Sequence, residues 1–167
     1  MASTVTISKL TKGSIFTSII TLLFVWPPTT VFSEDVNPLY YAAARGDEKK
    51  VLEILQNGTD INRPNQSGKT PLMGASANGN IRITRLLLSH GADFTIQDNK
   101  GNTALMDAVV FGYYEIANLL ISAGADVNAK NAKNLSVLVQ AQKGPNKKIV
   151  KLLEDAGAQA QVDEKKK

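Results

Sequence analysis

Apolar residues recur along this chain in short helical runs that are separated by glycine. One run covers 71–78 and is preceded by Thr70, a residue type that caps helix N-termini. Gly79 interrupts it, and a second run then places apolar side chains at helical spacing, at Ile83, Leu86 and Leu87. Gly91 follows, where a glycine in the left-handed conformation ends many helices. The pattern predicts two short helices joined by a tight turn.

The same helix pair recurs at a constant step along the chain, the step from Leu39 to Leu72. Three columns of identical residues mark this period: Leu39, Leu72, Leu105 and Leu138; Ala42, Ala75, Ala108 and Ala141; and Gly58, Gly91, Gly124 and Gly157. The small alanines suit helices that pack closely against each other. The period predicts four repeats, at approximately 35–64, 65–97, 98–130 and 131–161, of which the middle two hold the best core.

One segment resembles the ankyrin repeat: it reads Gly68-Lys69-Thr70-Pro71-Leu72, with Leu86-Leu87 and Gly91-Ala92-Asp93 behind it. The resemblance implies an all-α fold, an ankyrin-repeat solenoid of four helix-turn-helix repeats with short hairpin-like turns, over 34–161. We expect two leucine pairs to face neighbouring repeats on both sides: Leu86, Leu87, Leu119 and Leu120. The last repeat departs from the pattern at Asn134, Pro145 and Glu154, and we interpret these changes as capping of the exposed end.

The N-terminal segment 1–33 has the pattern of a secretory signal peptide. Lys9 and Lys12 precede an apolar run over 15–26, and this run is shorter than the roughly 20 residues that a spanning helix needs. We expect cleavage after Ser33, and an uncleaved membrane anchor is the alternative. Both place the remainder outside the cytoplasm, either periplasmic or secreted. Residues 162–167 form a basic tail that we expect to be disordered.

Composition argues against most enzymatic chemistry. The chain has no cysteine, which excludes disulfides, thiolate metal sites and cysteine nucleophiles, and its single histidine lies directly before Gly91. We therefore predict no catalytic, cofactor-binding or metal-ligating residues and no cofactor. The net charge is +4, but the basic residues are interspersed with acids or gathered at the C-terminal end, so we expect no nucleic acid as a partner.

The resemblance also implies where a partner protein would bind, because ankyrin repeats hold partners on the turn tips and the exposed side of each first helix, which line a concave face. The matching positions are Gln66, Ser67, Lys69, Asn78, Asn99, Lys100, Asn102, Val110, Phe111, Lys133 and Lys143. Phe111 stands out because its sister positions, the equivalent positions of the other three repeats, hold Arg45, Asn78 and Gly144. The core therefore does not require an aromatic ring there.

These observations favour an exported, monomeric interaction module that binds a protein partner and has no stable membrane insertion after signal cleavage. The alternative is an accessory or protective subunit of a separate exported enzyme. A third possibility, a small enzyme on the repeat scaffold, lacks any group of residues to support it.

Overall fold

The computed structural model describes residues 37–159. The predicted signal peptide with its cleavage site, and the predicted tail over 162–167, lie outside the described residues. Within 37–159 the chain forms eight α-helices and no strand, apart from one isolated bridge between Lys130 and Ser136. The helices are α1 (Pro38–Arg45), α2 (Glu48–Gln56), α3 (Pro71–Ala77), α4 (Ile81–Ser89), α5 (Ala104–Phe111), α6 (Tyr114–Ser122), α7 (Val137–Lys143) and α8 (Lys147–Asp155). This confirms the all-α prediction.

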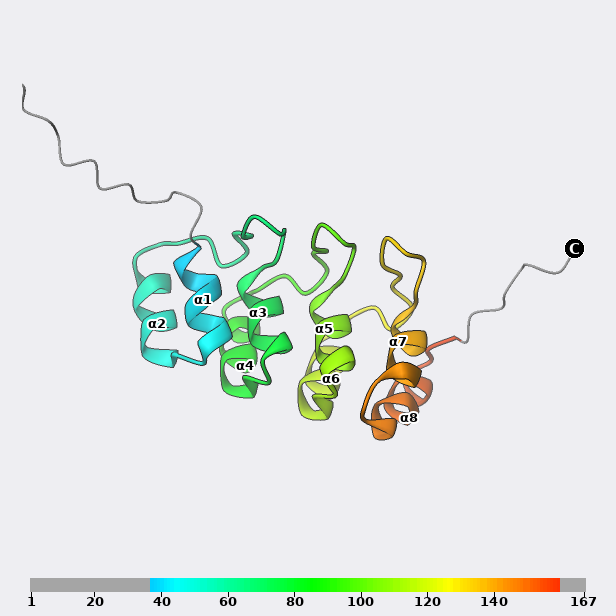
Figure 1. Ribbon diagram of the computed structural model, residues 1–167. Coiled ribbons are helices and arrows are strands. Elements are labelled where there is room, and N and C mark those ends of the chain that lie inside the picture. Colours follow the sequence, from blue (N-terminus) through cyan, green and yellow to red (C-terminus); the bar gives the residue numbers. More distant parts are fainter. Residues whose placement is uncertain (1–36, 160–167) are drawn as a thin grey trace, which may run out of the picture. The chain divides into compact units, whose positions relative to one another are not determined.

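The helices form four successive pairs that stand side by side, with the first helix of each pair in one row and the second in another (Figure 1). Adjacent first helices pack against each other more extensively than adjacent second helices do. The described part of the stack therefore bends toward the row α1, α3, α5 and α7. We call the exposed surface of these four helices, together with the turn tips 65–69, 98–102 and 131–135, the inner face. In the part of the chain that the structure describes, no helix is long and apolar enough to cross a membrane.

Each first helix begins at a side-chain cap, and these caps lie one period apart. They are Asn37, Thr70, Thr103 and Ser136. In each case the side-chain oxygen accepts a hydrogen bond from the backbone N–H three residues later, which satisfies a donor that has no partner within the helix. The cap expected at Thr70 is confirmed. The residues at the equivalent position of the other three repeats cap their first helices in the same way.

The turn tips owe their shape to a second column of polar side chains, Asn65, Asp98 and Asn131. In each tip the side-chain Oδ1 accepts hydrogen bonds from two backbone N–H groups of its own turn. Three residues later Gly68 and Gly101 adopt positive φ, and Asn134 does the same with φ of 58°. Asn134 was interpreted as a capping substitution. The structure corrects this, because asparagine tolerates the left-handed conformation and so preserves the turn that glycine makes elsewhere.

The core runs through all four pairs and is densest in the middle. Leu72, Leu87, Leu105 and Leu120 are at most 1% exposed. Leu86 is partly buried and packs against the core, and Leu119 is partly buried, so the two members of each leucine pair do not contribute equally to the core. Successive residues of a helix point about 100° apart, so only one of two adjacent leucines can face the core fully. Glu154 is exposed, as expected of a residue at the end of the stack.

A polar contact joins the first two pairs where α4 begins. Asn80 Nδ2 donates to Ala43 O at 3.0 Å and to Ala44 O at 2.8 Å, at the end of the preceding first helix. In the third pair the corresponding residue is Tyr113, whose ring lies over Gly79. A Cβ at Gly79 would lie 2.6 Å from Tyr113 Cε1, so glycine leaves the space that the ring occupies. An aromatic contact therefore replaces the amide contact between the second and third pairs.

Candidate functional site

The predicted binding residues lie on the inner face in two groups. Lys69, Asn102 and five others belong to the turn tips, and Asn78, Val110, Phe111 and Lys143 lie near the ends of the first helices. Because α5 has eight residues, its length of about 12 Å separates the two groups. Lys69 and Asn102 are half-buried, and the remaining predicted residues are exposed: Gln66, Ser67, Asn78, Asn99, Lys100, Val110, Phe111, Lys133 and Lys143.

Several turn-tip residues are engaged within the stack. Asn99 donates from its backbone N–H to Ser67 O at 3.1 Å and from Nδ2 to Gln66 O at 3.0 Å. Asn102 Oδ1 accepts from Asn131 Nδ2 at 3.2 Å. These contacts tie each tip to the next one. Part of the predicted binding group therefore holds the tips in register, while Gln66 and Ser67 keep their side chains exposed.

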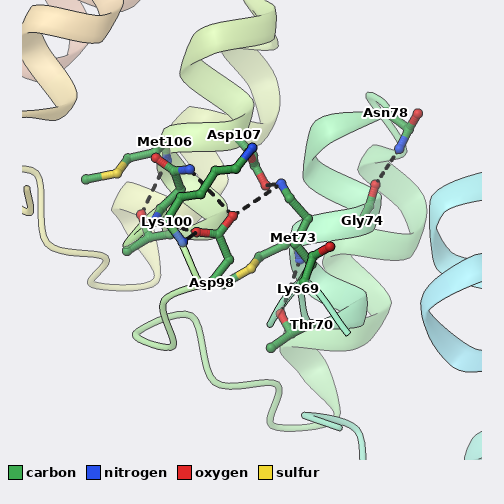
Figure 2. A network of polar contacts seen from close by, with 12 residues as sticks. Lys69, Thr70, Met73, Gly74, Asn78, Asp98, Lys100, Met106 and Asp107 are labelled. Carbon is green, nitrogen blue, oxygen red and sulfur yellow. Dashed lines mark hydrogen bonds and ion pairs between the residues drawn. The ribbon is translucent and has the colours of Figure 1, made fainter. Parts of the chain in front are cut away.

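Lys69 lies between two acidic residues of the next repeat. Its Nζ is 2.7 Å from Asp107 Oδ2 and 3.7 Å from Asp98 Oδ2, and Figure 2 shows its side chain directed toward both carboxylates. Asp98 and Asp107 are both buried, whereas the Lys69 side chain remains 25% exposed. Lys69 was predicted as a partner contact. The structure places it in an ion-pair network that links the second repeat to the third.

Burial controls the ionisation of this network. Desolvation raises the pKa of the Asp107 carboxyl above its ordinary value, although the hydrogen bond and charge of Lys69 act in the opposite direction. Burial also disfavours the charge of Lys69, yet the hydrogen bond to Asp107 and the charges of Asp107 and Asp98 raise the pKa of its ammonium. The network therefore keeps Lys69 charged over the whole neutral range.

The second group centres on an aromatic patch, which we define as Val110, Phe111 and Tyr113. Phe111 is 54% exposed, Val110 43% and Tyr113 36%. The ring centroids of Phe111 and Tyr113 are 6.5 Å apart with an interplanar angle of 32°. Such a contact lies within the range of favourable aromatic pairs and holds the two rings together at the surface. The patch lies at the C-terminal end of α5, away from the turn tips.

A pocket of about 270 Å³ opens beside the aromatic patch. It is lined mainly by apolar and aromatic groups from the starts of α4 and α6 and from the turns before them. Its lining residues are Gly79, Ile81, Gly112, Tyr113, Tyr114, Glu115, Ile116 and Asn146. Tyr113 belongs to both the patch and the pocket. The two features therefore adjoin through Tyr113, and the polar side chains Glu115 and Asn146 also line the pocket.

Sequence reasoning missed three residues of this face. Tyr41 is 46% exposed on α1, and Arg45 is exposed at the end of the same helix. Their sister positions hold unlike residues, which is the signal that the core does not use them. Asp107 is the only charged residue in the apolar helix α5, and this isolation could have marked it for a buried ion pair with a neighbouring repeat.

Three other titratable side chains have local structural roles. His90 Nδ1 lies 2.9 Å from Leu86 O at the end of α4. Asp93 Oδ1 accepts from Thr95 N at 2.7 Å, and Asp126 Oδ1 accepts from Asn128 N at 2.8 Å, as turn residues do. Among residues 37–159, no group of three or more acidic or histidine side chains is placed to hold a metal ion.

Comparison with known proteins agrees with this architecture. The family model for ankyrin repeats (3 copies) matches residues 39–131, more than half of the chain. A search of curated proteins finds no match. The pair α7 and α8 continues beyond the matched residues with the same capped first helix and the same turn tip. The chain therefore belongs to the ankyrin-repeat family.

Proposed function

We propose that this protein is exported and binds a partner protein through its inner face, with Phe111 as the central contact. Ankyrin repeats generally mediate interactions between proteins, and the family is typically non-enzymatic. The residues of the inner face extend this general role to a particular surface. The pattern of the N-terminal segment 1–33 supports export.

The observation that carries the proposal is the exposure of the aromatic patch at the end of α5 and in the turn that follows it. Phe111 shows more than half of its surface to solvent, although three sister positions do without an aromatic ring. Exposed aromatic side chains on a fixed scaffold contribute strongly to protein interfaces, because they bury large area at low entropic cost. The adjacent pocket provides room for a side chain of the partner.

The test is capture of the partner from the exported fraction of the source cells, with the purified protein and three variants as bait. Phe111→Ala should weaken binding about thirtyfold, which corresponds to about 2 kcal/mol, without unfolding the protein. Lys100→Glu, at a turn tip, should chiefly slow association. Lys49→Glu is the matched control, because Lys49 is exposed on α2 in the other row of helices.

Titration of the captured partner decides between the surfaces. An unchanged affinity for Phe111→Ala together with a loss for Lys49→Glu would place the interface on the second helices and refute the proposal. The identity of the captured protein separates the two functional alternatives. An exported enzyme that loses activity without this chain would support the accessory-subunit alternative.

A further inference from the structure

We infer that the inner face binds an acidic, extended segment of the partner, anchored by one large apolar side chain on the aromatic patch. The inference rests on the proposed function and specifies the chemistry of the partner. It is carried by the distribution of charge over the two rows of helices.

All exposed charges of the inner face are basic. They are Arg45, Lys100, Lys133 and Lys143. None of them forms an ion pair within the part of the chain that the structure describes. The acids of this face, Asp98 and Asp107, are buried against Lys69, so they present little charge to a ligand. Within its defined bounds the inner face therefore exposes bases and no acid, and the exposed acids nearest to it are Asp47, at the position of Tyr113 in the first repeat, and Glu115, beside the patch.

The second helices have a different balance. They expose Glu48, Glu53, Glu115, Glu154 and Asp155 together with basic residues. Mixed charge of this kind is typical of a solvated surface. Because acids are kept to one row while the other exposes bases alone, the inner face is suited to an acidic partner.

The apolar part of the inner face lies between its basic ends. Arg45 and Phe111 occupy the same position in the first and third repeats, and Lys143 occupies the position of Val110 in the fourth. Packed helices stand about 8–10 Å apart, so Arg45 lies two steps and Lys143 one step from the patch. An extended chain rises about 3.3 Å per residue, so acids about six residues to one side and three to the other side of the anchor would reach both charges.

A nucleic acid is a less suitable ligand for this surface. Single strands bind grooves in which several aromatic rings stack successive bases beside a continuous line of positive charge. Here the line between Arg45 and Phe111 passes the small or neutral residues Ala77 and Asn78. One aromatic patch with spaced charges matches a peptide with one anchor and spaced acids.

The probe is a ten-residue synthetic peptide with glutamate at each end and tryptophan at the seventh position, a spacing that follows from the distances above. Its reversed sequence tests the opposite chain direction, and an otherwise identical peptide with glutamine at both ends tests the charges. Fluorescence titration of the purified protein at low and high salt measures the affinities. Oligothymidylate of similar length serves as the nucleic-acid probe.

We expect one direction of the acidic peptide to bind about tenfold more tightly than its glutamine analogue at low salt, and this advantage to vanish at about 1 M salt. Arg45→Glu and Lys143→Glu should each remove part of the advantage, and Lys49→Glu should leave it unchanged. A peptide that carries lysine in place of the glutamate nearest position 143 should regain binding to the Lys143→Glu variant of the protein. Phe111→Ala should lower the affinity for the acidic peptide and for the glutamine analogue alike, by about thirtyfold.

The outcomes separate the inference from the proposed function. Equal affinity for the acidic and glutamine peptides, both weakened by Phe111→Ala, would refute the acidic partner and leave the proposed surface standing. A peptide affinity that Phe111→Ala leaves unchanged would contradict the proposed surface itself. Absence of binding by every peptide, or tighter binding of oligothymidylate, would refute the inference.

Discussion

At the residue scale, the inner face depends on contacts inside the stack as much as on groups shown to solvent. Lys69 sits at a turn tip of the inner face, yet its ammonium is held by Asp107 and Asp98. An ion pair whose acids are buried is costly to break, because removal of one partner leaves the other charge without compensation. Lys69 therefore stabilises the contact between the second and third repeats.

Lys69→Met should lower the free energy of unfolding by about 2 kcal/mol at neutral pH, because Asp107 is then ionised and buried without its cation. Burial already raises the pKa of Asp107, and loss of Lys69 raises it further. A raised folded-state pKa adds stability below the ordinary value of 3.8, and this contribution is lost as pH rises through the folded-state value. The cost of the substitution should therefore shrink toward pH 4.

Urea denaturation of both proteins between pH 4 and pH 7 measures this difference. Lys133→Met, at an exposed turn-tip position, is the control and should cost little at either pH. A cost for Lys69→Met that does not change with pH would contradict the role assigned to Asp107.

Tyr113→Asn should separate stability from binding. Asparagine at the sister position 80 ties its repeat to the preceding one through two hydrogen bonds, so the substitution can restore an amide contact while the ring over Gly79 is lost. We expect a change in melting temperature of only a few degrees and a clear loss of partner binding, because one ring of the aromatic patch is gone. Thermal unfolding and titration of the captured partner measure the two effects. A protein that unfolds instead would show that the ring is a core residue.

At the scale of the element, each helix is short and depends on its caps and on its neighbours. Isolated helices of seven to nine residues are unstable in water, because nucleation costs more than so few hydrogen bonds return. The repeated N-cap and the buried face of each helix compensate for this cost of nucleation. Substitutions should therefore act according to which face of the helix they change.

Leu87→Ala should lower the free energy of unfolding by about 2–5 kcal/mol, since Leu87 is 0% exposed in the middle of the stack. Glu154→Ala, on an exposed position of α8, should change it by less than about 0.5 kcal/mol. Chemical denaturation monitored by circular dichroism compares them. Equal midpoints for the two variants would contradict the assignment of the core.

The leucine pair on α6 provides a sharper comparison. Leu120 is fully buried and Leu119 is only partly buried. Leu120→Ala should therefore lower the free energy of unfolding at least twice as much as Leu119→Ala does. The two substitutions remove the same atoms from adjacent positions of one helix. A larger cost for Leu119→Ala would mean that α6 is rotated relative to the described structure.

At the scale of the whole molecule, the described stack is a linear array in which each repeat packs chiefly against its neighbours. Inner repeats are covered on both sides and end repeats on one, so cooperativity comes from the contacts between repeats. The segment before residue 37 carries a separate prediction, which rests on the sequence alone.

The mature exported protein should begin near Glu34, because a basic start, a short apolar run and the segment 31–33 suit signal cleavage. N-terminal sequencing of the protein from the exported fraction measures the start. Recovery of chains that retain Met1 and are found only in membranes would favour the uncleaved anchor instead.

The sequence by itself determined the period, the fold class and the approximate ends of the helices in the second repeat. Leucine, alanine and glycine recur at one constant spacing because each repeat must present the same contacts to the next, and a repeated contact leaves a repeated residue. The roles of Thr70 and Gly91 at helix ends could also be predicted from the sequence, because helix caps and left-handed turns depend on residues that are close along the chain.

Only the tertiary structure decided which face residues stay exposed and which pair with a neighbouring repeat. Lys69 and Asp107 are 38 positions apart, and no local rule shows that their side chains meet. Phe111 could be recognised from the sequence as an unusual residue, but its contact with Tyr113 and the space over Gly79 come from packing between helices. The physical reason is that local chemistry sets turns and helices, whereas burial and charge pairing depend on which segments the fold brings together.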